Sequence, residues 1–170
     1  MAIKDALLAE FDHELATTRR CLERAPEDKF SFKPHEKSWS LQQLVSHLAN
    51  LASWMSFTLQ QDSLDVAPPG EQPFKTPQLS SRAEVLKTFD ENARQSRAVL
   101  EKFSDADFMK PWSLLRTGKA VFTLPKVAVA RSFVLNHIIH HRGQLSVYLR
   151  LTGAQVPSIY GPSADESAFN

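Results

Sequence analysis

Hydrophobic residues recur at three- and four-residue spacing in four long segments of the chain, and this period is typical of amphipathic helices. The first segment spans about residues 3–24 and the second about residues 40–61. The third spans about residues 81–103 and the fourth about residues 126–151. Four such segments predict an all-α fold, a four-helix bundle with long connections.

Sequence signals at the helix ends support these boundaries. Ser40 is a predicted N-cap and Gln43 follows it three residues later, while Ser81 and Glu84 repeat the arrangement at the third helix. Both pairs have the spacing of a capping box. Gly153 stands where the last helix needs a left-handed terminating residue. We therefore expect one helix over each of the four segments.

The connections between the predicted helices are rich in proline and glycine. The stretch DVAPPGEQPFKTP, at residues 65–77, contains too many prolines to be helical. Residues 105–124 show no sustained period and predict a long excursion with a short extended pair around residues 112–122. No repeat, low-complexity tract or linker divides the chain, so we expect a single helical-bundle domain over residues 1–170.

Composition restricts the classes of function. Twenty Lys and Arg nearly balance nineteen Asp and Glu, giving a formal net charge of +1, so we expect no nucleic-acid partner. The single cysteine, Cys21, cannot form an internal disulfide, and we expect it to be a buried apolar residue rather than a nucleophile. The charged N-terminus does not resemble a signal peptide, and no apolar stretch approaches the ~20 residues of a membrane span. We expect a soluble cytoplasmic protein without membrane contact.

The stretch NHIIHHRGQL, at residues 136–145, holds three of the six histidines. At about 100° per residue, His137 and His141 lie about 40° apart inside the apolar arc of the fourth helix, and His140 lies at the margin of the polar face. The H-x-x-x-H spacing brings two imidazoles close enough to share one metal ion. Ile138 replaces the Glu of the H-E-x-x-H zinc motif, so a metalloprotease with its own helical general base is disfavoured.

A third ligand is available on the second helix. His47 lies beside the apolar arc of that helix, and facing arcs meet in a bundle, so we expect His47 to oppose His137 and His141. We expect His35, in a proline-flanked loop, and His13, between two acidic residues, to lie at the surface. Two interpretations remain open from the residues alone, a metal held by the three histidines or a core cluster of hydrogen-bonded imidazoles.

Two stretches together resemble a known family. WSLQQLVSHLANL, which begins at Trp39, and HIIHHRGQLSVYLRLTGAQVP, which begins at His137, resemble the DinB/YfiT-like family of candidate metalloenzymes. The resemblance implies a four-helix bundle with a metal held by His47, His137 and His141. The family includes bacillithiol S-transferases and a mycothiol-dependent maleylpyruvate isomerase, so the resemblance implies a metal-centred scaffold more firmly than any one substrate. It also implies a homodimer.

From this resemblance and the histidine pattern we expect a divalent-metal enzyme, a thiol (S-)transferase or a hydrolase acting on a small molecule such as a low-molecular-weight thiol. We expect zinc, with nickel as the other candidate, because imidazole ligands suit both. Three protein ligands leave a position for water or substrate. The alternative is a non-catalytic bundle stapled by the metal, or a stress-related interaction module.

Other residues are weaker candidates. His140 and Gln144 could assist catalysis, the first as a proton shuttle or support for a ligand and the second by lining the pocket. Trp54 and Tyr148 could form pocket walls. Arg142, on the rim of the apolar arc, is expected to form a salt bridge or to contact a terminal carbonyl. We expect the loops at residues 62–79 and 105–125 to determine specificity.

Overall fold

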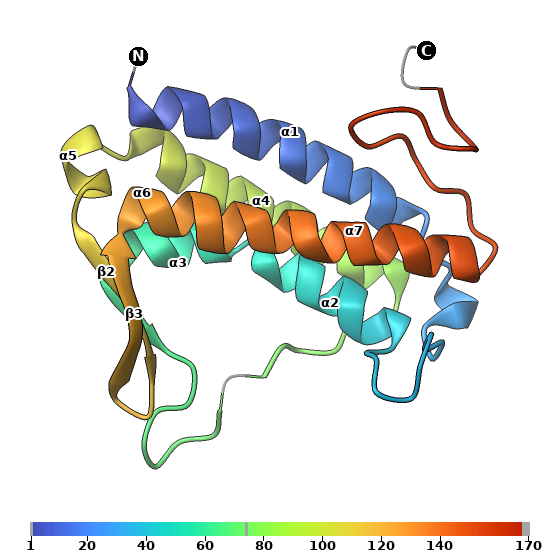
Figure 1. Ribbon diagram of the computed structural model, residues 1–170, viewed down its shortest axis with the longest axis horizontal. Helices are drawn as coiled ribbons and strands as arrows, with labels where there is room; N and C mark the ends of the chain where they lie inside the picture. Colours follow the sequence, from blue (N-terminus) through green and yellow to red (C-terminus); the bar gives the residue numbers. More distant parts are fainter. Residues whose placement is uncertain (1, 74, 168–170) are drawn as a thin grey trace.

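Four long helical stretches lie side by side in the computed structural model, which describes residues 2–73 and 75–167 (Figure 1). The helices of the bundle are α1 (Ile3–Glu23), α2 (Leu41–Leu51) followed by α3 (Trp54–Gln60), α4 (Arg82–Lys102), and α6 (Lys126–Ala128) continuing through a π-helix (Val129–Leu135) into α7 (Asn136–Leu151). A 3₁₀ turn (Glu27–Lys29) and the short helix α5 (Asp105–Phe108) lie in the connections. The predicted four-helix bundle is confirmed.

The order of the helices around the bundle is α1, α4, α2–α3 and α7, because α1 and α2 each contact both α4 and α7. In Figure 1, α1 and α7 run from left to right, whereas α2–α3 and α4 run from right to left. The neighbours α2–α3 and α4 are therefore parallel. The connection between them, residues 61–81, must return along the whole bundle, which explains its length.

A small three-stranded sheet projects from one end of the bundle. It has the order β1 (Ser63–Asp65), β2 (Pro111–Arg116) and β3 (Lys119–Pro125), with β1 parallel to β2 and β2 antiparallel to β3. The predicted extended pair is this β2–β3 hairpin, whose turn has positive φ at Thr117 (52°) and Gly118 (73°). Asp65 of β1 accepts hydrogen bonds from both turn N–H groups, at 3.1 and 2.7 Å. Strand β1 was not predicted, because three residues are too few to show the alternation of hydrophobic and polar positions that marks a strand.

The second predicted helix is interrupted at Ala52 and Ser53. The Ser53 hydroxyl donates to the Asn50 carbonyl at 2.8 Å, and the Ser56 hydroxyl donates to the Ser53 carbonyl at 2.7 Å. The Ser56 N–H bonds to Ser96 of α4 at 3.2 Å instead of a carbonyl of its own helix. Such side-chain bonds compete with the helical ladder, so the expectation of one continuous helix to Gln61 was wrong.

The last predicted helix is also irregular, because seven of its residues, Val129–Leu135, form a π-helix. A π-helix has more residues per turn than an α-helix, so side-chain directions counted at 100° per residue apply to α7 but not to this segment. Hydrophobic periodicity does not reveal a deviation this short. Segments of this kind occur frequently at functional sites.

The predicted caps are confirmed except for one bond. The Ser40 hydroxyl accepts from the Gln43 N–H at 3.2 Å, and the side-chain amide oxygen of Gln43 accepts from the Ser40 N–H at 2.8 Å, which completes the box. The Ser81 hydroxyl accepts from the Glu84 N–H at 3.1 Å, but the Glu84 carboxylate binds the Ser80 N–H at 2.8 Å instead of returning to Ser81. The box at α4 is therefore open.

Helix α7 ends at Leu151, and Gly153 takes the left-handed terminating position as predicted, with a φ of +76°. The Ala154 N–H donates to the Leu149 carbonyl at 2.9 Å, the long bond of a Schellman motif. The chain then returns over α1, where Glu166 pairs with Arg24 at 2.7 Å. No helix in residues 2–73 and 75–167 is long and apolar enough to cross a bilayer.

The core contains buried polar side chains beside its apolar ones. Cys21 is completely buried, as expected. Arg142 is only 1% exposed, and it pairs with Glu14 of α1 at 2.6 Å and donates to the Tyr160 hydroxyl at 2.6 Å. The predicted salt bridge of Arg142 is confirmed, but its predicted place on a rim was wrong. Helix α1 covers the side of α7 that carries Arg142. The apolar arc of α7, taken from one helix alone, does not reveal which neighbouring helix packs beside it.

Candidate metal centre

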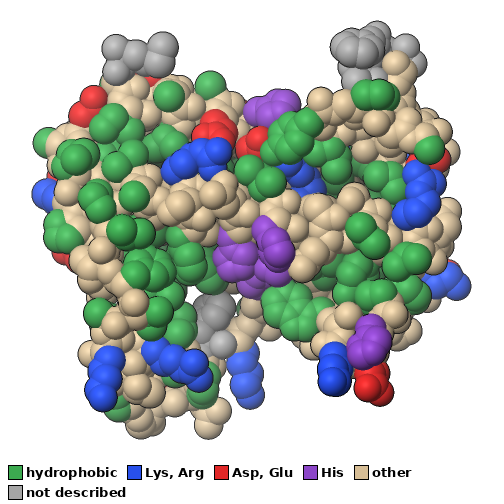
Figure 2. All heavy atoms as spheres, viewed as in Figure 1, with side chains coloured by type: hydrophobic (Ala, Val, Ile, Leu, Met, Phe, Trp, Pro, Cys, Tyr) green, Lys and Arg blue, Asp and Glu red, His purple; other side chains and the backbone are tan. Residues whose placement is uncertain are grey.

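Three histidines from two helices meet at one place. His47 of α2 is 9% exposed and His141 of α7 is 7% exposed, with His137 half-buried one turn before His141. One possible ligand nitrogen from each residue lies within 4.8 Å of the other two. Figure 2 shows histidine side chains gathered in the middle of one face, beside a hollow between two projecting parts of the molecule. The structure thus brings together the three residues that the sequence singled out.

The spacing of the two closest nitrogens fits a shared metal ion. Nε2 of His47 lies 3.3 Å from Nε2 of His137. Two ligands at about 2.0–2.1 Å from a tetrahedral zinc ion are separated by about 3.4 Å. The same distance fits a hydrogen bond between two neutral imidazoles, the alternative left open by the sequence. Metal content distinguishes the two interpretations.

Burial keeps these imidazoles neutral. Loss of solvation, assisted by the neighbouring His141 and His137, lowers the pKa of His47 to about 3. The pKa of His137 falls to about 4 for the same reason, with His141 and His140 as the neighbours. Burial also lowers the pKa of His141, although the bond to Gln144 opposes the shift. At pH 7 all three therefore offer lone pairs, as metal ligation requires.

Polar groups behind the cluster orient two of the rings. Nδ1 of His141 lies 2.7 Å from Oε1 of Gln144. A carbonyl oxygen only accepts, so His141 carries its proton on Nδ1 and leaves the Nε2 lone pair free. Nε2 of Gln144 in turn lies 3.2 Å from Nε2 of exposed His140. On the other helix, Nδ1 of His47 lies 3.4 Å from the Thr76 hydroxyl.

His137 differs from the other two ligand candidates. Its Nδ1 is buried and has no hydrogen-bond partner among the described residues. Its ring is instead enclosed by aromatic side chains, with Trp54 at 5.4 Å and Phe133 at 5.8 Å between ring centroids. On the Nδ1 side, packing rather than hydrogen bonding therefore holds the His137 ring in place.

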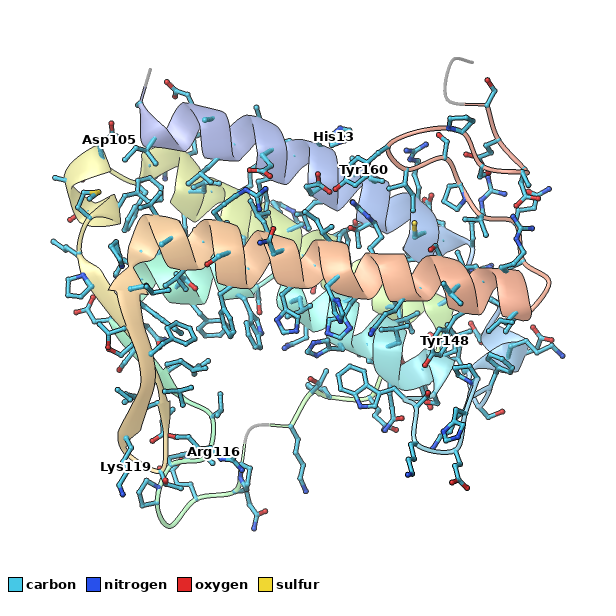
Figure 3. The ribbon with its side chains drawn as sticks, in the orientation of Figure 1. His13, Asp105, Arg116, Lys119, Tyr148 and Tyr160 are labelled. Carbon is cyan, nitrogen blue, oxygen red and sulfur yellow. The ribbon has the colours of Figure 1, made fainter. Side chains whose placement is uncertain are left out.

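Trp39 is a site residue that the sequence analysis missed. Its ring stacks on His141 at 5.4 Å and 12°, and meets His47 edge-on at 5.0 Å. The Tyr148 hydroxyl donates to the Trp39 carbonyl at 2.9 Å, and Tyr148 points from α7 toward this loop (Figure 3). The available signal was the position of Trp39 directly before the N-cap of the helix that bears His47.

Two cavities flank the histidines on either side of Trp39. One, of about 500 Å³, borders His47 and is lined by Trp39, Gln43, Ser46, His47, Trp54, Val66, Lys75, Thr76 and Gln78. The other, of about 460 Å³, borders His141 and is lined by Pro34, Ser38, Trp39, His141, Gln144, Val147 and Tyr148. None of these described lining residues is acidic. The loop at residues 62–79, predicted to determine specificity, contributes to the first cavity, although its Phe74 lies outside the described residues.

The remaining histidines lie where the sequence placed them. His13 is exposed and stacks on Tyr160 at 6.3 Å, and Figure 3 shows this pair near α1, on the other side of α7 from the cluster. His35 is exposed in its loop, where its Nδ1 accepts from the Lys37 N–H at 3.1 Å. Neither residue approaches the three clustered histidines.

Comparisons with known proteins agree with this architecture. The chain is 26% identical to YjoA of Bacillus subtilis over 163 residues, which cover 90% of this chain and 93% of YjoA. A DinB-like protein from Bacillus cereus has the same fold, with a TM-score of 0.72 at 18% identity over 92% of this chain and 97% of that one.

Two further structures carry descriptions of activity. YfiT of Bacillus subtilis, described as a probable metal-dependent hydrolase with an unusual four-helix bundle topology, matches with a TM-score of 0.64 at 15% identity over 89% of each chain. A mycothiol-dependent maleylpyruvate isomerase matches at 0.50 and 12% identity, over 92% of this chain and 65% of the isomerase. The sequence model of the DinB family matches residues 1–169, and the chain therefore belongs to the DinB family.

Proposed function

We propose that the protein is a metal-dependent enzyme in which His47, His137 and His141 hold one divalent ion, zinc in preference to nickel. The observation that carries the proposal is the approach of two neutral Nε2 atoms to 3.3 Å beside a third buried imidazole. A divalent ion in such a site supplies a Lewis acid that lowers the pKa of a water or thiol bound to it.

The protein groups around the histidines have separable tasks. Gln144 fixes the tautomer of His141, and Thr76 contacts the outer nitrogen of His47 from the connection that follows α3. Trp39 stacks on His141 and meets His47 edge-on, Trp54 meets His137 edge-on, and the two indole rings limit the access of water. The two flanking cavities leave room for a small molecule on either side of Trp39. Such an arrangement supports a catalytic site open to substrate rather than a closed structural one.

Activation of a thiol is the reaction that these surroundings support best. No carboxylate is among the described residues that line the two cavities, so a general base of that kind is not at hand. A free thiol has a pKa of about 8.5 and water one of about 15.7, so the thiol ionises with much less assistance. We therefore place thiol (S-)transfer first and hydrolysis second. The fold shared with a mycothiol-dependent isomerase and with YfiT supports keeping both.

Metal analysis followed by two assays tests the proposal. Untagged protein is expected to bind one divalent ion per chain, to lose activity after chelation and to regain it when the metal is returned. Consumption of a small thiol with an aryl halide measures transfer, and release of nitrophenol from an ester measures hydrolysis. His47→Ala is expected to abolish both activities, with exposed His13→Ala as the matched control. Activity that survives complete removal of the metal contradicts the proposal.

The non-catalytic alternative predicts a different result. If the metal only staples α2 to α7, its removal lowers the melting temperature while no thiol or ester is consumed at any metal loading. If neither stability nor turnover depends on metal, the three histidines form a hydrogen-bonded core cluster. The proposed enzyme requires metal-dependent turnover, which neither of these cases shows.

We also propose that the protein forms a homodimer. Val147 and Leu151 are one turn apart on α7 and each is 56% exposed, an apolar strip that a second copy would cover. Light scattering of the wild-type protein and of Val147→Glu tests this. A monomeric wild-type protein contradicts the proposal.

A further inference from the structure

A third cavity, of about 240 Å³, lies between α3, the sheet and the π-helix. Its apolar walls are Trp54 and Phe57 of α3, Leu64 of β1, Trp112 of β2 and Phe133 of the π-helix. Gln61, at the end of α3, is exposed at its border. No charged side chain is among the described residues that line it. A bound group must therefore be neutral.

This cavity shares a wall with the histidine site. Trp54 lines both this cavity and the cavity of about 500 Å³ next to His47. The rings of Trp54 and Phe133 also lie 5.4 and 5.8 Å from the His137 ring. A molecule whose reactive group lies at the histidines can therefore extend an apolar group into this cavity.

The irregular parts of the fold form the walls. The Phe133 ring packs 5.4 Å from Trp54 and 5.4 Å from Phe122 of β3, and 6.4 Å from Trp112. Trp112 is 2% exposed, and its indole nitrogen has no hydrogen-bond partner among the described residues. Packing alone therefore holds the Trp112 indole ring. The small sheet and the π-helix together position these aromatic rings.

The size and the walls define the occupant. An apolar cavity of about 150 Å³ admits benzene, so the larger volume here holds one six-membered ring with a small substituent. Aromatic walls favour a flat ring, because stacked and edge-to-face contacts add to the burial of apolar area. We propose that this cavity binds a neutral, flat apolar ring of the substrate. The reaction of the substrate at the histidine site rests on the proposed function above. Binding of the ring in this cavity does not require the metal.

Binding of 4-fluorotoluene to the metal-free protein, followed by fluorine NMR, tests the cavity by itself. The fluorine signal of the probe is expected to broaden when the protein is added. Toluene should displace the probe and restore the sharp signal. Leu64→Trp fills the cavity and should weaken binding by about tenfold or more, since even one methylene in an apolar pocket changes affinity by that amount. Val121→Trp introduces the same ring on β3 at a residue that is 59% exposed and outside the cavity lining, and it should bind as the wild type does.

A second variant keeps the test valid if Leu64→Trp does not fold. Gln61→Trp places the blocking ring at an exposed position and should also abolish broadening while the circular dichroism spectrum stays unchanged. Equal binding by the wild type and by folded Leu64→Trp or Gln61→Trp overturns the proposal, as does the absence of binding to the wild type. Metal content is measured on the same proteins before the metal is removed, so failure of the metal proposal and failure of the ring site are distinguishable.

Discussion

Nε2 of His47 and Nε2 of His137 lie 3.3 Å apart although 90 positions separate the two residues in the chain. The contact depends on the packing of α2 against α7, which are neighbours in the bundle. It joins two helices by two imidazoles that burial keeps neutral.

The paired substitution His47→Ala and His137→Ala is expected to remove the bound metal and leave the fold intact. Two of the three proposed ligands are lost, and a single imidazole does not retain a divalent ion against a chelator. Elemental analysis of untagged protein measures the metal, and circular dichroism measures the fold. His13→Ala, on the other side of α7, should keep the wild-type metal content. Metal that remains after both ligands are lost shows that the assignment is wrong.

Gln144→Leu is expected to weaken metal binding by about 10- to 100-fold, the usual cost of losing the partner of a ligating histidine. Gln144 accepts from Nδ1 of His141 at 2.7 Å, and without this bond the ring is free to turn or to change tautomer. Gln144→Glu keeps an acceptor and should rescue affinity. Competition with a coloured chelator gives the constants. Exposed Gln95→Leu on α4 is the control, and an equal loss there would show a non-specific effect.

The sequence predicts the ligand candidates because they belong to regular structure. His137 and His141 are one helical turn apart, and only the geometry of α7 is needed to see that they face the same way. His47 follows from the facing apolar arc of α2. For the same reason, the caps at Ser40 and Gly153 were found from a few neighbouring residues.

The parts that the sequence did not predict depend on tertiary contacts. Trp39 reaches His141 because Tyr148, 109 positions away, binds its carbonyl. The interruption at Ser53 depends on the bond between Ser56 and Ser96 of another helix. No local pattern contains either relationship. Arg142 was predicted on the rim of the apolar arc because the pattern of one helix does not show that α1 packs over that side of α7.

The metal-free protein is expected to lose stability as the pH falls below 6.5. The pKa of His47 is about 3 in the folded protein and has an ordinary value of 6.5, so between these values the unfolded chain binds a proton that the folded chain does not. Stability then rises with pH across this window, by up to about 1.4 kcal/mol per pH unit for one such histidine. His47→Gln should show a smaller fall in the free energy of unfolding between pH 7 and pH 5. Urea titrations measure it, and equal slopes for the two proteins would contradict the assigned shift.

Cys21 is expected to resist thiol reagents in the native protein. Its side chain is completely buried, and burial raises the pKa of its thiol to about 11, so thiolate is scarce at pH 8. Reaction with a disulfide reagent should proceed only as fast as the protein unfolds, and urea should accelerate it. Rapid labelling of the folded protein at pH 8 would place Cys21 among the reactive groups instead.

The pair of Glu14 and Arg142 should matter far more to stability than any exposed pair. Arg142 is 1% and Glu14 is 5% exposed, and their charged atoms lie 2.6 Å apart. Glu14→Leu leaves a buried guanidinium without its counter-charge, and we expect it to cost about 3–5 kcal/mol of unfolding free energy. Adding Arg142→Met removes that unpaired charge, so the double variant should recover part of the loss.

Arg97→Met is the matched control for this pair, because Arg97 and its partner Asp12 are 45% and 46% exposed. An exposed pair of this kind contributes about 0–1 kcal/mol. Urea denaturation gives the free energies of unfolding of the wild type, Glu14→Leu, the double variant and Arg97→Met. Because Arg142 follows His141 directly and anchors α7 to α1, the Glu14→Leu variant should also bind metal more weakly, whereas Arg97→Met should not. A double variant less stable than Glu14→Leu alone would show that Arg142 is stabilised by groups other than Glu14, with the Tyr160 hydroxyl as the partner already in contact.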